Sequence, residues 1–404
     1  MTAERRAMLL LIVLSGTIIS ICIGLRQSLG IFMRPMTAEL GITAAAFGFS
    51  IALSNIVWGL AQPFAGAIAD KHGPRLVLVV TALVYAAGLL LMLLSKTLPG
   101  ALEFAGFLTG VGTAGAGFGV LLGTVSRATP PEKRSQTVGI VAAAGSLGTM
   151  IIAPLGQALI DGFGWRTAMV AFAVLAGSIA LLALPIREPR APGNPPREKP
   201  NAIPAVREAL AHRGYVFMTL AFFACGFQLV FITTHLPLYL QLCGVAPGVA
   251  ASALALIGLF NIIGTLSAGA LGGRFSKKYL LSIIYATRGI FISLLVFLPL
   301  TPVVLYTFAV GIGLLWLGTV PLTNGLVGQI FGMRYAAMLA SIVFFGHQIG
   351  SFIGVWLAGY LYDTTGSYSG ALICSIGLGI FAMLVNLPVN ERPLAERRAA
   401  AAAA

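Results

Sequence analysis

The sequence predicts an all-α membrane protein whose twelve transmembrane helices form two pseudo-symmetric six-helix bundles. Composition is the first observation: 58% of the 404 residues are apolar and 9% are charged, whereas a soluble domain carries about 25% charged residues. One or two soluble cores cannot bury that much apolar surface, but a bilayer accepts it as an apolar solvent. The other observations are twelve long apolar runs and a polar, proline-rich segment that separates the first six from the last six.

Each predicted helix is an apolar run long enough to cross a bilayer, which takes about 20 residues. The first six runs cover 8–32, 44–68, 76–95, 102–126, 136–160 and 166–186. The last six cover 214–240, 249–272, 279–298, 303–327, 336–361 and 368–388. The first run shows no small-residue cleavage site, so we expect a retained helix and not a signal peptide.

The two sets of runs predict an N-terminal bundle over residues 1–186 and a C-terminal bundle over 214–390. Between them lies a linker, 187–213, with six prolines and alternating charges. Such a segment cannot pack a core, and we expect an extended tether. Residues 391–404 form a polar and alanine-rich tail.

The basic residues predict the orientation in the membrane. If the N-terminus is inside, 20 of the 25 lysines and arginines fall in cytoplasmic segments, and three (Arg34, Lys96 and Arg166) fall on the opposite side. The positive-inside rule then places both termini and the linker in the cytoplasm, with the chain in the cell (inner) membrane. This distribution accounts for the net charge of +13, so we expect no nucleic-acid partner.

A short loop after the second run carries a specific motif. It reads Gly66-Ala-Ile-Ala-Asp70-Lys71-His-Gly73-Pro-Arg75 and resembles the loop signature G-x-x-x-D-x-x-G-x-R of the major facilitator superfamily. Asp70 is placed there to pair with basic neighbours while the two halves close. The resemblance extends to PEKR at 131–134 and GWR at 164–166, whereas the matching loop of the second half keeps its glycines and bases but lacks the aspartate.

Membership of this superfamily would imply a rocker-switch carrier with the substrate site between the two halves, near the bilayer midplane. Within the superfamily, the chain most resembles the branch of monocarboxylate porters and oxalate–formate exchangers. That likeness rests on Gly24 to Phe32 in the first run, and on Gly346 to Gly354 and Gly359 to Gly366 around the eleventh. Where the animal carriers of the branch place an acid and an arginine, four apart on the eighth run, this chain has Asn261 and Thr265.

Arg288 is the first candidate for substrate binding. It lies about ten residues into the ninth run, hence about 15 Å deep, where an arginine costs about 3 kcal/mol on insertion scales. All twelve acids fall in loops or within about a turn of a run's end. A buried cation without a counter-ion favours an anionic substrate; the alternative is an arginine that pairs with backbone carbonyls at a helix crossing.

The other candidate site residues are one histidine, a second arginine and three amides. His347 lies near the middle of the eleventh run and could donate a hydrogen bond to a carboxylate or couple transport to protons; a helix–helix hydrogen bond is the alternative. Arg26, nearer the outer end of the first run, could attract anions or extend towards the membrane surface. Asn55, Gln228 and Asn261 could line the site or join helices.

These residues lead to a hypothesis and two alternatives. The hypothesis is a secondary active transporter of small organic anions, monocarboxylates above all, that works by alternating access, with Arg288 and His347 at the substrate. The first alternative is an exporter of drug-like or amphiphilic compounds; the second, a sensor without transport, is disfavoured because no additional soluble domain is present. Symport, exchange and uniport all remain open. We expect a monomer that is not an enzyme, with no cofactor and no metal, since no catalytic set or ligand spacing is present.

Overall fold

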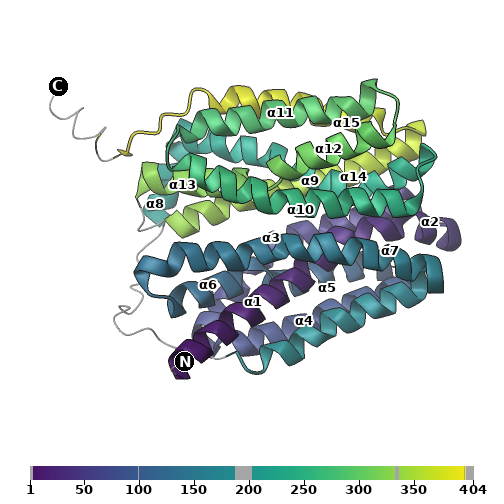
Figure 1. The fold of residues 1–404 in the computed structure, drawn as a ribbon, viewed down its shortest axis with the longest axis horizontal. Coiled ribbons are helices and arrows are strands. Elements are labelled where there is room, and N and C mark those ends of the chain that lie inside the picture. Colours follow the sequence, from purple (N-terminus) through teal and green to yellow (C-terminus); the bar gives the residue numbers. More distant parts are fainter. Residues whose placement is uncertain (1–2, 99, 187–202, 333–335, 395, 397–404) are drawn as a thin grey trace. The chain divides into compact units, whose positions relative to one another are not determined.

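The structure is a computed structural model that describes residues 3–98, 100–186, 203–332, 336–394 and 396. Within these residues all regular secondary structure is helical, which confirms the predicted fold class (Figure 1). The helices of the N-terminal half are α1 (Ala3–Ser28), η1 (Leu29–Phe32), α2 (Met33–Leu40), α3 (Ala44–His72), α4 (Pro74–Leu91), η2 (Met92–Leu94), α5 (Ala101–Ala116), α6 (Phe118–Ala128) and α7 (Pro131–Ala183). Those that follow are α8 (Ile203–Ala211), α9 (Arg213–Leu242), α10 (Pro247–Gly272), α11 (Lys277–Phe297), α12 (Pro302–Leu315), α13 (Thr319–Phe331), α14 (Ala336–Thr365) and α15 (Ser369–Asn386).

Among the described residues, eleven helices are long and apolar enough to cross a membrane. One of them belongs to α7, whose 53 residues join two helices across Gly164. Gly164 has φ 79° and ψ 160°, a conformation that glycine adopts without a steric penalty. The fifth and sixth predicted runs therefore meet at this residue, and the predicted count of twelve spans holds.

Two further spans are interrupted. The fourth consists of α5 and α6, which meet at Gly117 in an extended conformation. The tenth consists of α12 and α13, which meet at residues 316–318. A break in a transmembrane helix leaves backbone amides and carbonyls that need other partners. At 316–318 the side chain of Arg288, from α11, approaches the break.

Local sequence signals explain where several helices begin. Thr43 accepts a hydrogen bond from the Ala46 amide (3.1 Å) and caps α3, and Thr301 accepts one from the Val304 amide (3.3 Å) and caps α12. Proline is the first residue of α4, α7, α10 and α12, where the missing N–H costs nothing.

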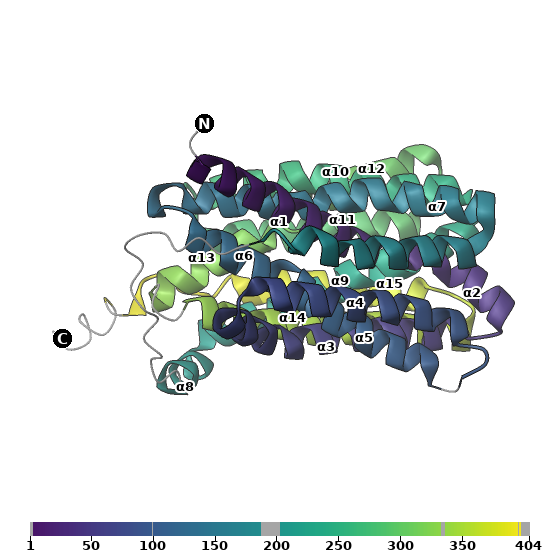
Figure 2. The ribbon, with the colours of Figure 1, turned by 90° about the horizontal axis from the view of Figure 1, so that it is seen from below.

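The described contacts divide the chain into two compact units. Unit 1 holds residues 1–195 together with 230–259 and 352–368, and unit 2 holds 196–229, 260–351 and 369–404. Inside unit 1, α1 packs along α7, and α3 and α4 pack on α5 (Figure 2). Inside unit 2, α11 lies beside α15 and contacts α12 and α13 (Figure 1).

The linker was predicted to be an extended tether, and part of it is helical. Residues 187–202 lie outside the described part of the chain, but 203–211 form α8. After Pro204 this stretch contains good helix formers and Ala209, which is fully buried. The good helix formers and the buried Ala209 favour a short packed helix over the extended form that was predicted. The domain limits at 186, 213 and 390 remain predictions.

Glycines set the closest helix contact of unit 1. A Cβ built on Gly148 of α7 would lie 1.8 Å from the Ser20 carbonyl oxygen of α1, and one on Gly24 would lie 2.6 Å from the Gly148 backbone. The two helix backbones thus touch without side chains between them. Small residues allow such close approach of helices in a membrane, where packing drives association.

Candidate functional site

Arg26 lies in the last turn of α1, inside a predicted span. Its guanidinium donates a hydrogen bond to the Asn55 side-chain oxygen of α3 and lies over the Trp58 ring, 4.6 Å from the ring centroid. Asn55 in turn donates to the Ile51 carbonyl (2.7 Å). Two neutral side chains of one helix therefore orient the cation, and the negative end of the α1 dipole favours it.

The surroundings of Arg26 leave it open to an anion. Asn55 is fully buried and Trp58 is 5% exposed, whereas Arg26 itself is partly exposed. Among the described residues, no acidic side chain forms an ion pair with Arg26. A partly exposed guanidinium with neutral neighbours has donors available for a carboxylate.

Arg288 has a different environment, because its donors meet the break in the tenth span. The side chain is fully buried. Its Nη2 donates to the Leu315 and Trp316 carbonyls, both at 2.5 Å, and its Nε donates to Leu315 at 3.2 Å. Nη1 contacts the Cys225 sulfur at 3.2 Å. In this conformation Arg288 compensates the carbonyls that α12 leaves unpaired at its end.

His347 is joined to Arg288 through a cysteine. The Cys225 thiol interacts with both side chains and lies 3.4 Å from the Thr319 hydroxyl. The His347 ring stacks on Phe344 and is 8% exposed, and its Nδ1 lies 3.1 Å from the Gln348 side-chain oxygen. The structure thus brings the two predicted midplane residues of the second half into one buried cluster.

The two remaining amides join helices. The Asn261 side-chain oxygen accepts from the Leu317 amide (3.0 Å), at the same break that Arg288 occupies, and from the Thr265 hydroxyl (2.9 Å). The Gln228 side-chain amide donates to the Ser375 carbonyl of α15 at 2.8 Å. Of the six candidates for substrate binding, Arg26 and Asn55 lie together in unit 1, and Arg288, His347, Gln228 and Asn261 all lie in unit 2.

The family model of the Major Facilitator Superfamily matches residues 8–355, which is most of the chain. The chain belongs to this superfamily. It is therefore a multi-pass membrane transporter, and the resemblance predicted from the loop motifs is confirmed.

Its relatives within the superfamily include carriers of small anions. The chain is 24% identical over 374 residues to monocarboxylate transporter 13 of Rattus norvegicus, with 90% of this chain and 85% of the relative covered. It is 24% identical over 372 residues to the oxalate:formate antiporter of Oxalobacter formigenes, with 90% and 87% covered. Among solved structures, the D-xylose-proton symporter matches with a TM-score of 0.76 and 14% identity over 97% of this chain and 100% of that one, a likeness of fold.

The superfamily loop between α3 and α4 places its acid in an ion pair. Asp70, near the end of α3, pairs with Arg127 in the last turn of α6 at 3.0 Å, with both side chains about one-third exposed. Gly73 has φ 90° and turns the chain between the two helices. Gly66 lies within α3, and Arg75 is exposed at the start of α4. The gating role of these residues remains a prediction.

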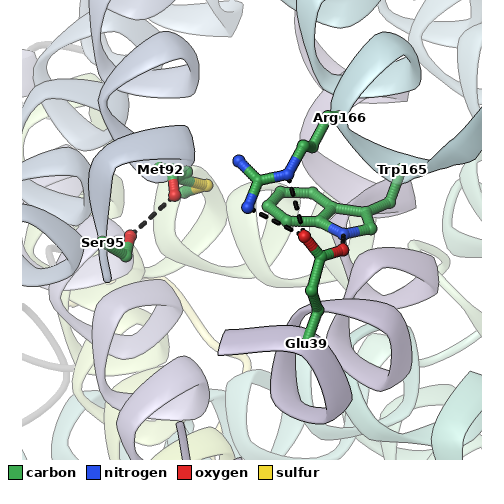
Figure 3. A network of polar contacts seen from close by, with 5 residues as sticks. All are labelled: Glu39, Met92, Ser95, Trp165 and Arg166. Atoms are coloured by element: carbon green, nitrogen blue, oxygen red, sulfur yellow. Dashed lines mark hydrogen bonds and ion pairs between the residues drawn. The ribbon is translucent and has the colours of Figure 1, made fainter. Parts of the chain in front are cut away.

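The superfamily-like GWR motif lies at the bend of α7 and holds the short helix α2. The Glu39 carboxylate of α2 accepts hydrogen bonds from the Trp165 indole (2.5 Å) and from Arg166, with the nearest Arg166–Glu39 approach at 2.9 Å (Figure 3). Nearby, the Ser95 hydroxyl donates to the Met92 carbonyl at 2.7 Å. The motif thus fixes the connection after the first span.

Three polar residues that the sequence did not identify as candidates, Glu391, His235 and Asp363, make contacts between distant segments of the chain. Glu391, in the tail, accepts from the Lys278 amide (2.6 Å) and the Ser276 hydroxyl (3.1 Å) and so caps α11. His235 and Asp363 both make contacts between helices of different halves inside unit 1. The sequence could have identified Asp363 and His235, since both are polar residues near predicted span ends. It could not have identified Glu391, because no local pattern predicts that a tail residue caps α11.

Proposed function

We propose that the protein is a secondary transporter of small organic anions, monocarboxylates above all, which works by alternating access. The observation that carries this proposal is Arg26, a partly exposed guanidinium within a span whose described partners are neutral. A cation in a low-dielectric site attracts an anion more strongly than it would in water. The relatives named monocarboxylate transporter and oxalate:formate antiporter both support small organic anions, and the first supports monocarboxylates.

The count of charges around Arg26 favours one carboxylate over two. A single guanidinium compensates one carboxylate through a bidentate pair. A dicarboxylate at this site would leave its second charge unpaired, at a large desolvation cost. The Trp58 ring beside the cation offers an apolar face for the organic part of the anion.

The proposal moves the first anchor from Arg288 to Arg26. For Arg288 to bind a carboxylate, its guanidinium would have to exchange the Leu315 and Trp316 carbonyls for the substrate. Arg26 has no such backbone partner to release among the described contacts. We therefore assign the primary carboxylate contact to Arg26 and keep Arg288 and His347 as secondary candidates.

Transport by purified protein in proteoliposomes tests this assignment. We expect Arg26→Gln to reduce uptake of a radiolabelled monocarboxylate about 10- to 150-fold, because a hydrogen bond to a charged group contributes about 1.5–3 kcal/mol. Arg26→Lys should retain partial uptake with a raised KM, since lysine keeps the charge but not the planar fork.

Arg166→Gln is the matched control, because Arg166 is an exposed arginine in an ion pair with Glu39; its uptake should stay near that of the wild type. Wild-type uptake in the Arg26→Gln variant would refute Arg26 as the anchor. If the purified protein transported amphiphilic compounds but no carboxylate, the result would support the alternative function, an exporter of drug-like or amphiphilic compounds.

A further inference from the structure

One end of unit 1 joins backbones from both halves of the chain. A Cβ on Gly30 would lie 2.2 Å from the Thr233 carbonyl oxygen of α9, and one on Gly359 of α14 would lie 2.7 Å from the Ala44 carbonyl oxygen of α3. At these two points the helix backbones are in direct contact. Alternating access requires the halves to part at one end and then the other. We therefore call this closed contact, which includes His235, Asp363 and Tyr368, the gate.

A carboxylate from α14 closes the gate on α3. Asp363 accepts hydrogen bonds from the Ala44 amide (3.1 Å) and the Ala45 amide (2.7 Å), the first residues of that helix. These amides carry the positive end of the α3 dipole, which favours a negative charge. The cap comes from a helix of the other half, so opening of the gate removes it.

His235 of α9 lies in the same contact and is fully buried. Its Nε2 lies 2.8 Å from the Val355 carbonyl oxygen of α14, and its Nδ1 lies 2.9 Å from the Tyr368 hydroxyl. A carbonyl only accepts, so Nε2 carries a hydrogen and the neutral ring accepts from Tyr368 at Nδ1. Gly48 of α3 covers this edge of the ring, since its Cβ would lie 3.4 Å from Nε2.

The surroundings of His235 favour the neutral ring while the gate is closed. Burial disfavours an imidazolium. Asp363 is the acidic side chain of the gate, and its carboxylate is held by the Ala44 and Ala45 amides. Three tyrosines complete the titratable groups around it: Tyr368, Tyr362 stacked on Tyr368, and Tyr239 of α9. The Tyr368 hydroxyl is the donor to Nδ1 of the neutral ring.

We propose that His235 is a proton-coupling residue of the gate: protonation of its imidazole opens the gate, and closure releases the proton. The sign follows from solvation, because the imidazolium is more stable where water reaches it, and water reaches it only when α3 parts from α9 and α14. Lower pH therefore favours the open gate. This inference rests on the proposed function, because it needs alternating access, and it assigns the coupling role to His235 and not to His347.

The test measures gate opening without substrate. Spin labels at Ala38→Cys and Thr364→Cys, both exposed positions of unit 1, report the separation of α2 from α14, with the exposed Cys243 and Cys374 replaced by serine. One linked proton changes the open-to-closed ratio by at most about tenfold per pH unit. We expect at least about a tenfold rise in the open population between pH 8 and pH 5, and its loss in His235→Gln.

His72→Gln is the control and should keep the full pH response, because His72 is an exposed histidine in the last turn of α3. Tyr368→Phe should raise the open population at every pH and keep the pH response, because it removes a partner of the closed form and leaves the titrating group in place. If His235→Gln does not fold, Tyr368→Phe still provides the test. An unchanged pH response in His235→Gln, or no response in the wild type, overturns the inference.

Transport assays separate this outcome from the proposed function. In proteoliposomes, His235→Gln should abolish accumulation driven by a pH gradient while downhill carboxylate movement persists. A pH-sensitive gate in a protein that moves no carboxylate would refute the substrate class and leave the role of His235 standing. Carboxylate transport with a gate indifferent to pH would do the reverse.

Discussion

Two arginines, Arg26 and Arg288, lie inside the predicted spans, and they differ in the groups that they contact. Arg26 is partly exposed and held by neutral side chains, whereas Arg288 is fully buried and meets two backbone carbonyls and a thiol. From the sequence, Arg288 was the first candidate for substrate binding because it lies deeper in its span than Arg26 does. It could not show that the tenth span breaks beside it, because nothing in residues 302–331 marks the break as an acceptor for an arginine.

The residues of the candidate site were thus found by type and depth, while their pairings were not. Cys225, for example, links Arg288 to His347. Its thiol carries no local pattern that predicts such a partner. Pairings depend on which faces of α9, α11 and α14 meet, and that information is spread along the chain.

Removal of the Arg288 side chain should destabilise the protein. Arg288→Leu leaves the Leu315 and Trp316 carbonyls buried without a partner, at about 1–3 kcal/mol for each group. We expect the free energy of unfolding to fall by about 2–4 kcal/mol, which thermal or denaturant unfolding in detergent would measure. Arg166→Gln should cost less than about 1 kcal/mol because its ion pair is half exposed. If Arg288→Leu were as stable as the wild type, Arg288 would not support the break.

At the scale of elements, apolar length and punctuation predicted the helices well. Predicted ends such as 44 for α3 and 272 for α10 agree with the structure. Gly164 lies between the predicted fifth and sixth runs, but the bend at Gly117 and the break at 316–318 were not predicted. An apolar run has the same composition whether its backbone is continuous or interrupted. The cap of α11 by Glu391 was also missed, since its partner lies more than 110 residues away in sequence.

The crossing of α1 and α7 gives a prediction at this scale. Gly148→Ala would place a methyl group 1.8 Å from the Ser20 carbonyl oxygen, and overpacking of this kind costs about 1–3 kcal/mol. We expect a lower unfolding midpoint. Gly139→Ala, on the same helix with open space around its Cβ, should be neutral or stabilising by up to about 1 kcal/mol. Equal midpoints for the two variants would show that the helices are not in close contact.

At the scale of the whole molecule, composition and the lengths of the apolar runs predicted a twelve-span membrane protein without reference to any tertiary contact. The reason is that the bilayer imposes length and polarity on each span separately. Substrate identity has no such constraint, because it depends on a few side chains whose neighbours come from distant segments. The contact units also differ from the sequence halves, since 230–259 and 352–368 pack with the first half.

The predicted orientation can be tested with a native thiol. Cys243 is exposed just after α9, at a span end that the positive-inside rule places outside the cytoplasm. A membrane-impermeant maleimide should therefore label intact cells, and Cys243→Ser should remove most of that labelling. Labelling that requires disrupted cells would reverse the assigned orientation.

The two interrupted spans give the duplicated architecture an uneven mechanical stiffness. The fourth and tenth spans hold equivalent places in the two halves, and both bend. At the first bend the Gly117 amide still bonds the Thr113 carbonyl (2.9 Å), so glycine itself permits the turn. At the second, Arg288 and Asn261 tie the exposed backbone to neighbouring helices. One half therefore carries a compliant joint and the other a braced one, and the strain of each transport cycle should be taken up mainly by the first.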